Sequence, residues 1–434
     1  MMTATHRINK IRAFLTQIHQ EIGLEFGIQL WDGSYIPADW STKSLAITIA
    51  DEGVIASLLR KPKIITLANL WVAKRINIIN GTIFNLIEKK PKGRTRDLKK
   101  FIPILSALKT SLYFLFISRG GPWPLEGIAK GKINKGCLEK NKKNISYHYD
   151  LSNKFYQLWL DEEMVYSCGY FHDWEDNLNT IQIQKLDMIC QKLRLKPGEI
   201  LLDIGCGWGA LCCYAAQHYG VKAHGVTLSE QQANYANEKI KRLNLTSNVK
   251  IELVDYTLIE GLAAYDKITS VGFFEHVEND NFSKYFQTIH RLLKPGGLFL
   301  HHAITRPGKS HAARTGKKPP EFKALIRYIF PGGELDYIGR TITNLELHGF
   351  EIHDVEAWRE HYQRTCRFWH DRLLANYDAA CLEVGEVKTR LWLIYLASCS
   401  ITFERNNCGL YQTLASKRVK GAVGLPPTRR DLYI

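Results

Sequence analysis

The chain lacks an apolar segment long enough to cross a membrane. Its longest apolar stretch, residues 101–117, is interrupted by Lys109 and falls short of the roughly 20 residues that a spanning helix needs. A second stretch, residues 391–403, is shorter still. The beginning of the chain, from Met1 to Arg7, also lacks the apolar core of a secretory signal peptide. We therefore expect a soluble or peripherally attached protein without a signal peptide.

Paired cysteines of the zinc-binding kind are absent as well. The ten cysteines are scattered along the chain, several of them inside apolar runs such as Leu211-Cys212-Cys213-Tyr214. No Cys-x-x-Cys pair recurs at the spacing of a zinc site. We interpret the cysteines as reduced thiols of a cytoplasmic protein and expect no bound metal.

Acidic residues are too few to balance the basic ones. The 43 Asp and Glu residues face 58 Lys and Arg residues, which gives a net charge of +15. Such an excess implies an acidic partner, and nucleic acid and an anionic membrane are the usual candidates. The basic stretches 89–96 and 130–143 contain no interleaved aromatic side chains on which bases could stack. We therefore expect no nucleic acid partner.

The length of 434 residues and the hydrophobic content of 45% predict more than one domain. Residues 3–26 have a loose helical spacing of apolar residues, and short apolar runs separated by turn residues follow them. We predict a smaller N-terminal α+β domain over residues 1–120, a basic linker over 121–145 and a second domain over 146–434.

From about residue 180 onward, strand-like apolar runs alternate with helical patterns, which favours a mostly parallel α/β sheet. The expected strands are 200–204, 222–227, 249–254, 267–271, 298–302 and 350–355, and the helices between them include 229–243 and 281–293. The turn 293–297 should separate the second of these helices from the following strand. We also predict an inserted cap over about 305–345, a long helical stretch over 360–403 and a last strand near 410–414.

A glycine-rich turn follows the first of these strands. The strand ends in Leu201-Leu202-Asp203-Ile204, and the turn is Gly205-Cys206-Gly207-Trp208-Gly209. Glycines at such a turn let the backbone approach a ligand closely. Followed by Ala210, the turn also satisfies the dinucleotide pattern G-x-G-x-x-G/A, which is weak evidence by itself.

Two features favour S-adenosylmethionine over a dinucleotide. Asp203 places a carboxylate where the methionine ammonium of that cofactor would need a partner. The next strand ends in His224-Gly225-Val226-Thr227-Leu228-Ser229 and offers no acid for a ribose 2′-hydroxyl. The alternative is a tight turn without a ligand, for which three glycines and a strand-end Asp have little use.

Five motifs occur in an order that resembles the cyclopropane-fatty-acyl-phospholipid synthase family, which includes the mycolic acid cyclopropane synthases. They are Tyr166-Ser167-Cys168-Gly169-Tyr170-Phe171, Leu202-Asp203-Ile204-Gly205-Cys206-Gly207-Trp208-Gly209, Gly225-Val226-Thr227-Leu228-Ser229-Glu230-Gln231-Gln232, Phe274-Glu275-His276-Val277 and Phe330-Pro331-Gly332-Gly333. The resemblance covers about residues 145–417. It implies a class I S-adenosylmethionine methyltransferase fold, Rossmann-like, with a seven-stranded mostly parallel sheet and an inserted helical cap.

The resemblance also implies the residues of the cofactor site. The expected S-adenosylmethionine contacts are Tyr166, Ser167, Asp203, Gly205, Cys206, Gly207, Trp208, Gly209, Thr227, Leu228, Ser229, Gln231, Gln232, Asp255 and Tyr256. Asp255 ends the third strand, where an Asp commonly reads the adenine amine in such folds.

A second group of residues matches the family's catalytic pocket, in which a bound bicarbonate ion is the base. The matching side chains are Cys168, Glu275, His302 and Tyr362, with backbone contacts expected around Val271 and Ile304. The alignment favours His302 over the neighbouring His301. Cys399 matches a cysteine that recurs in the family; no base adjacent in sequence would activate it, so we expect it to line the pocket.

The resemblance implies an unsaturated phospholipid in an anionic membrane as the substrate and a peripheral location at the inner, cytoplasmic face. The basic runs and the segment 101–117 fit attraction to such a membrane, although that segment could equally be a buried interdomain helix. Methylation of an amine, a methyl-branched product, a non-enzymatic lipid-binding role and a homodimer stay open as alternatives. The chain departs from the family pattern at Glu334-Leu335-Asp336-Tyr337, near the expected acyl entrance.

Overall fold

The computed structural model describes residues 3–89, 104–125, 151–308 and 334–433. Most of the predicted linker and most of the predicted cap lie outside these residues. The described chain divides into two compact units, which are treated separately below. The first consists of residues 3–89, 104–125 and 385–397, and the second of residues 151–308, 334–384 and 398–433.

The first unit is an α+β structure, as predicted. Its four-stranded sheet has the order β2-β1-β3-β4, formed by Tyr35–Ile36, Gly27–Gln29, Ala46–Ile49 and Ile76–Ile79. Its helices are α1 (Ala4–Ile22), α2 (Glu52–Arg60), α3 (Ile64–Val72), α4 (Ile83–Glu88) and α6 (Ile104–Leu112). The predicted first helix begins where the Thr3 side chain caps it and ends at Gly23, whose φ of 66° is left-handed.

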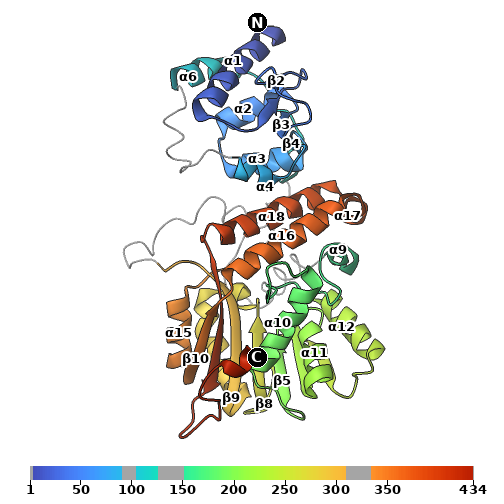
Figure 1. Ribbon diagram of the computed structural model, residues 1–434, viewed down its shortest axis with the longest axis vertical. Helices are drawn as coiled ribbons and strands as arrows, with labels where there is room; N and C mark the ends of the chain where they lie inside the picture. The colour runs from blue at the N-terminus through green and yellow to red at the C-terminus, as the bar shows by residue number, and fades with distance from the viewer. Residues whose placement is uncertain (1–2, 90–103, 126–150, 309–333, 434) are drawn as a thin grey trace. The chain divides into compact units, whose positions relative to one another are not determined.

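The second unit is built on a seven-stranded sheet with the order β10-β11-β9-β8-β5-β6-β7 (Figure 1). The strands β5 to β9 run parallel to one another, and β11 pairs antiparallel with both β9 and β10. All the predicted strands are present, as β5 (Ile200–Ile204), β6 (Lys222–Thr227), β7 (Val249–Leu253), β8 (Tyr265–Val271), β9 (Leu293–Thr305), β10 (Phe350–Ala357) and β11 (Gly409–Lys417). The predicted class I methyltransferase fold is confirmed.

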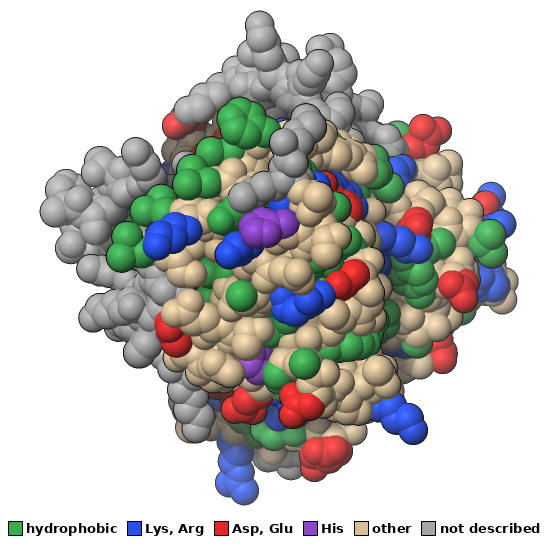
Figure 2. Space-filling view, turned by 90° about the horizontal axis from the view of Figure 1, so that it is seen from above, with side chains coloured by type: hydrophobic (Ala, Val, Ile, Leu, Met, Phe, Trp, Pro, Cys, Tyr) green, Lys and Arg blue, Asp and Glu red, His purple; other side chains and the backbone are tan. Residues whose placement is uncertain are grey.

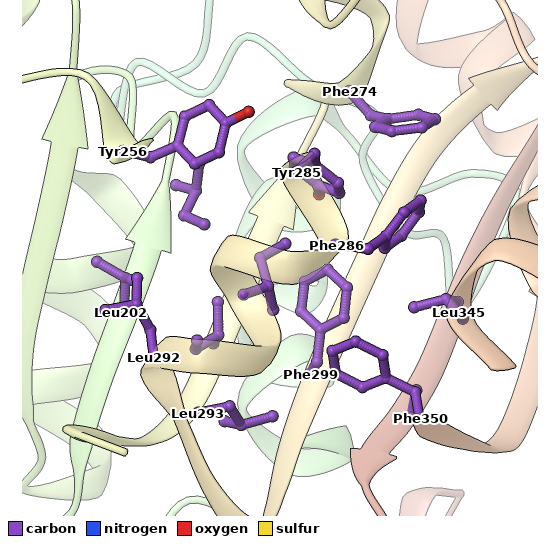
Figure 3. Packing of buried hydrophobic residues seen from close by; sticks show 14 of the residues in the cluster. Leu202, Tyr256, Phe274, Tyr285, Phe286, Leu292, Leu293, Phe299, Leu345 and Phe350 are labelled. Atoms are coloured by element: carbon purple, nitrogen blue, oxygen red, sulfur yellow. The ribbon is translucent and has the colours of Figure 1, made fainter. Parts of the chain in front are cut away.

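Helices cover both faces of this sheet because successive strand residues point to opposite sides. On β9, Leu298 and Leu300 pack on the face covered by α10 (Leu178–Lys192) and α11 (Ala210–Tyr219). Phe299 between them packs on the other face, against α13 (Phe282–Leu292) and α15 (Ile338–Leu347). Figure 3 shows this second core, in which the rings of Phe299 and Phe350 lie 5.8 Å apart.

The predicted helical stretch near the end of the chain is confirmed, and the predicted turn 293–297 was wrong. The stretch 360–403 consists of three helices, α16 (Arg359–Ala375), α17 (Tyr377–Val384) and α18 (Glu386–Glu404). Gly385 separates the last two with a φ of +82°, a left-handed conformation that a helix interior does not contain. The turn 293–297 belongs to β9, which begins at Leu293 and shifts its register against β8 within this turn.

Among the described residues, no helix combines the length and the apolar composition that crossing a bilayer requires.

Candidate active site

The predicted glycine turn lies between β5 and α11. Gly205, Gly207 and Gly209 all have positive φ, at +80°, +54° and +81°. A Cβ atom on Gly205 would lie 2.7 Å from the Phe273 ring, which is too close for any side chain. Glycine at position 205 is therefore required both by the backbone conformation and by the space.

A pocket opens at this turn, along the carboxyl ends of the parallel strands where doubly wound sheets bind ligands. The predicted cofactor residues that line it are Tyr166, Ser167, Asp203, Gly205, Cys206, Gly207, Trp208, Thr227, Leu228, Gln232 and Tyr256. These residues come from four separate segments of the chain.

Four predicted cofactor residues lie outside the pocket lining. Gly209 caps α11, and Ser229 caps α12 (Glu230–Arg242) by accepting a hydrogen bond from the Gln232 amide. Gln231 is exposed on α12, and Asp255 accepts a hydrogen bond from a backbone amide two residues later. Contact of these four residues with the cofactor stays a prediction.

Opposite charges meet inside the pocket. Asp203 is buried and accepts a hydrogen bond from the Thr269 hydroxyl at 2.8 Å, and burial raises the pKa of Asp203 to about 6. Lys185 on α10 is only 2% exposed; its Nζ donates to the Ser167 hydroxyl at 3.0 Å, and burial lowers its pKa to about 8. The pocket thus offers an anion and a cation to a zwitterionic ligand, which suits the methionine part of S-adenosylmethionine.

Sequence reasoning missed Lys185. The signal for it was present, because Lys185 shares a helical face with Ile181, Met188 and Ile189, all of which are buried. A lysine on such a face either reaches the solvent or is buried with a hydrogen-bonding or charged partner, and only the structure distinguishes these possibilities.

Of the four predicted catalytic side chains, Cys168, Glu275 and His302 are buried and Tyr362 is partly buried, all in the second unit. None of the four lines the pocket, but Cys168 and Glu275 adjoin it in the chain. Cys168 follows the pocket residue Ser167, and Glu275 follows Phe273 by two positions. The Cys168 thiol lies 3.9 Å from the Trp358 carbonyl oxygen, which also accepts the backbone hydrogen bond of Tyr362. Glu275 accepts a hydrogen bond from the amide of Ile304, two residues after His302.

Glu275 lies in the short helix η3 (Phe274–His276) after β8. It is 3% exposed, and its Oε1 accepts a hydrogen bond from the Ile304 amide at 2.6 Å. Its Oε2 is buried without a protein partner among the described residues. Burial raises the pKa of Glu275 to about 7, so this carboxyl group can exchange a proton near neutral pH.

His301 and His302 point to opposite faces of β9. His301 contacts the Tyr285 hydroxyl at 3.1 Å within the aromatic core. His302 instead has its Nδ1 3.1 Å from the Gln412 amide nitrogen and its ring edge-on to Trp358, at 5.4 Å between centroids. Burial lowers the pKa of His302 well below its usual value, so its imidazole is neutral.

Burial also keeps the remaining predicted groups neutral. It raises the pKa of Tyr362 well above its usual value, and the same holds for the Cys168 thiol. Burial likewise raises the pKa of Cys366, one turn after Tyr362, well above its usual value. A nucleophilic thiolate is not what these surroundings favour, because no cation outweighs the cost of burial.

Within the described ranges, no group of three or more His, Cys, Asp or Glu side chains is arranged to hold a metal ion.

The buried state of Glu275 predicts a pH-dependent stability. Its pKa is raised on folding from 4.5 to about 7, so the folded state favours the protonated carboxyl. The resulting stability is complete below pH 4.5 and is lost as the pH rises through about 7. The Glu275→Gln variant cannot ionise at this position. Without ligand and above about pH 7, we expect its free energy of unfolding to be higher than that of the wild type by roughly 3 kcal/mol. Denaturation curves across the window test this, and a difference that is constant with pH would contradict it.

The parallel sheet, the glycine turn after β5 and the pocket beside it define a class I S-adenosylmethionine-dependent methyltransferase. The family model of mycolic acid cyclopropane synthetase matches residues 137–413. The chain belongs to this family, which confirms the resemblance seen in the sequence.

Individual relatives agree with this assignment. The probable fatty acid methyltransferase of Pseudomonas putida is 41% identical over 291 residues, covering 67% of this chain and 73% of the relative. The cyclopropane-fatty-acyl-phospholipid synthase of Escherichia coli K12 is 37% identical over 279 residues, covering 64% of this chain and 68% of the relative. The structure of mycolic acid cyclopropane synthase CmaA1 complexed with SAH and CTAB matches with a TM-score of 0.60 at 32% identity, covering 64% of this chain and 98% of that chain.

Proposed function

We propose that this protein transfers the methyl group of S-adenosylmethionine to the cis double bond of an unsaturated phospholipid acyl chain and closes a cyclopropane ring. The observation that carries this proposal is the group formed by buried Cys168, Glu275 and His302 with partly buried Tyr362, two members of which directly adjoin residues of the cofactor pocket. An alkene is a weak nucleophile, and its methylation leaves a carbocation that water would quench. A reaction of this kind needs a site that excludes water and holds a base.

Aromatic rings next to the pocket suit the developing positive charge. The pocket residue Tyr166 lies 5.2 Å from Trp369, and Trp369 lies 5.9 Å from Tyr362, between ring centroids. Trp159 contacts both Tyr166 and Trp369. The faces of such rings stabilise cations without acting as nucleophiles toward them.

The catalytic group fits a bicarbonate ion. Within the part of the chain that the structure describes, one buried carboxylate oxygen of Glu275 has no protein partner, and this oxygen could accept a hydrogen bond from the hydroxyl of that ion. Tyr362 and His302 are neutral and can donate hydrogen bonds to its oxygens. When bound, the ion would supply the base that removes the proton during ring closure. The chain's own contribution is to orient that base and to keep water away from it.

A methyl-branched product is the second candidate. The Pseudomonas putida relative, at 41% identity, is described as a probable fatty acid methyltransferase. Such an enzyme would share the cofactor pocket and the acyl acceptor and would differ only in which proton the carbocation loses.

The proposed activity is tested by mass spectrometry of acyl chains. The purified protein would be incubated with S-adenosylmethionine and vesicles of unsaturated phospholipid, with and without added bicarbonate. We expect a gain of one methylene per modified chain, stimulated by bicarbonate and retained after mild hydrogenation that reduces alkenes. A protein that binds S-adenosylmethionine but adds no carbon to the lipid would contradict the proposal and direct attention to amine acceptors.

We also propose that the first unit docks on the anionic surface of the membrane. Apolar side chains of α6 and the turn after it are exposed, namely Leu105, Leu108, Leu112, Leu115 and Phe116, the last at 97%. Exposed lysines accompany them at Lys109, Lys61 and Lys63. Figure 2 shows hydrophobic side chains in a row with Lys or Arg side chains beside them on the face seen from above. Leucines flanked by basic groups suit insertion between anionic headgroups.

Binding to vesicles tests this surface. We expect Leu108→Glu combined with Leu112→Glu to weaken co-sedimentation with anionic vesicles by at least about tenfold, because two anchors are lost and negative charge is added. The control is Leu347→Glu, which changes an even more exposed leucine on α15 in the second unit. Equal binding of all three proteins would place the membrane contact elsewhere.

A further inference from the structure

We infer that Lys192 and Gln412 lock His302 in the tautomer that carries its proton on Nε2, and so make it a hydrogen-bond donor that cannot act as the base. The inference rests on the proposed function only for its catalytic consequence. The lock itself is a property of the folded protein.

The lock begins at a buried lysine. Lys192, the last residue of α10, is 1% exposed, and its Nζ donates hydrogen bonds to the carboxylate of Glu356 and, at 2.7 Å, to Oε1 of Gln412. An ammonium group can only donate, so the carbonyl oxygen of the Gln412 amide must face Lys192. The orientation of this amide, which is often ambiguous, is thereby decided by chemistry.

The amide transmits the constraint to the histidine. With its oxygen held by Lys192, Gln412 presents its NH₂ group to Nδ1 of His302 at 3.1 Å. An NH₂ group needs an acceptor, so Nδ1 must carry the lone pair and Nε2 the proton. Both partners are fixed in the sheet, because Gln412 lies opposite His302 in the pairing of β11 with β9.

The groups around His302 oppose its protonation. Lys185 and Lys192 on α10 and His301 on its own strand all lower its pKa, in addition to burial. The carboxylate of Glu356 is engaged by Lys192, whose Nζ lies 5.0 Å from the centroid of the Trp358 ring. The Trp358 ring in turn contacts the His302 ring edge-on and, being uncharged, does not stabilise a protonated imidazole. A neutral ring whose one lone pair already accepts a hydrogen bond has none left with which to take a proton from substrate.

Lys192 and Gln412 are therefore positioning residues that act through His302. Residues that fix the tautomer of a functional histidine typically change activity by about 10- to 100-fold when they are removed. We expect Lys192→Met to lower kcat for lipid by at least about tenfold and to raise the bicarbonate concentration needed for half-maximal rate, with the KM for S-adenosylmethionine unchanged.

Nitrogen-15 NMR of histidine-labelled protein tests the lock without substrate. The chain has 15 histidines, and the signals of His302 are assigned by their loss in His302→Gln. We expect an unprotonated Nδ1 and a protonated Nε2 that persist across roughly pH 6 to 8. Lys192→Met should release the amide and mix the tautomers. Gln412→Glu should reverse the tautomer, because a carboxylate can only accept from Nδ1.

The matched control is Lys196→Met, which removes an exposed lysine four residues along the chain. It should leave both the His302 signals and the rate unchanged. If Lys192→Met does not fold, as judged by its thermal denaturation, Gln412→Glu alone decides the question. A wild-type His302 protonated on Nδ1, or unchanged signals in a folded Gln412→Glu variant, would overturn the inference. A protonated Nε2 in a protein that makes no cyclopropane would leave the inference intact and refute the proposed function instead.

Discussion

Replacement of Glu275 by glutamine is expected to reduce product formation by at least about 100-fold while the cofactor still binds. The carboxyl group is 3% exposed, and one of its oxygens accepts a hydrogen bond from the Ile304 amide. Its second oxygen is buried and has no donor among the residues that the structure describes. An amide of the same shape keeps an acceptor for Ile304 but replaces the other acceptor by a donor. The hydroxyl of the proposed base then loses its partner.

Turnover of unsaturated phospholipid in vesicles and binding of S-adenosylhomocysteine would be measured on the same preparations of each protein. The affinity for S-adenosylhomocysteine should change by no more than about twofold, because Glu275 is not among the residues that line the cofactor pocket. Glu278→Gln, three residues along the same loop, provides a matched control and should retain wild-type turnover. A Glu275→Gln variant with near-normal turnover would remove this residue from the mechanism.

Replacement of Asp203 by asparagine is expected to weaken S-adenosylmethionine binding by about 10- to 100-fold, the value of a hydrogen bond to a buried charge. Asparagine preserves the shape of the site and can still meet the Thr269 hydroxyl. It removes the negative charge that would face the methionine ammonium. Since burial raises the pKa of Asp203 to about 6, binding by the wild type should also weaken as the pH falls through 6.

Isothermal titration with S-adenosylmethionine measures both effects. The asparagine variant should lose the pH dependence together with the affinity. Asp266→Asn is a suitable control. Asp266 also accepts a hydrogen bond from a backbone amide, that of Ile200, but it lies near the start of β8, whereas the pocket residue Val271 is at the end of that strand. Equal affinities of the Asp203→Asn variant and the wild type would mean that the ammonium has another partner.

The strands and the cofactor turn could be predicted from the sequence because their signals are local. Apolar runs of strand length alternate with helices, and three glycines follow a strand-end Asp203. Each of these features is set by backbone sterics and by burial over a few residues. The same reasoning predicted the C-terminal helical stretch but not its division into three helices, because Gly385 alone gives a weak stop signal between the last two.

The buried polar network could not be predicted because it depends on contacts between distant segments. Lys185 and Lys192 are lysines in a helix, and lysines in helices are usually solvated. Their burial depends on partners such as Ser167 and Gln412, which lie 18 and 220 residues away in the sequence. His301 and His302 illustrate the same limit. Alternation along β9 predicts that the two side chains point to opposite faces of the sheet. Only the positions of α13 and Trp358 show that His301 lies in the aromatic core and His302 in the candidate catalytic group.

The fate of a trideuterated methyl group tests the central proposal most directly. The protein would be incubated with S-adenosylmethionine carrying a trideuteromethyl group and with unsaturated phospholipid vesicles, and the modified acyl chains would be weighed by mass spectrometry. Ring closure removes one deuteron from the transferred carbon, so the proposal predicts a product that retains two of the three. A product that retains all three would show that the proton is lost from the acyl chain instead, and would identify the enzyme as a fatty acid methyltransferase that makes a methyl-branched chain.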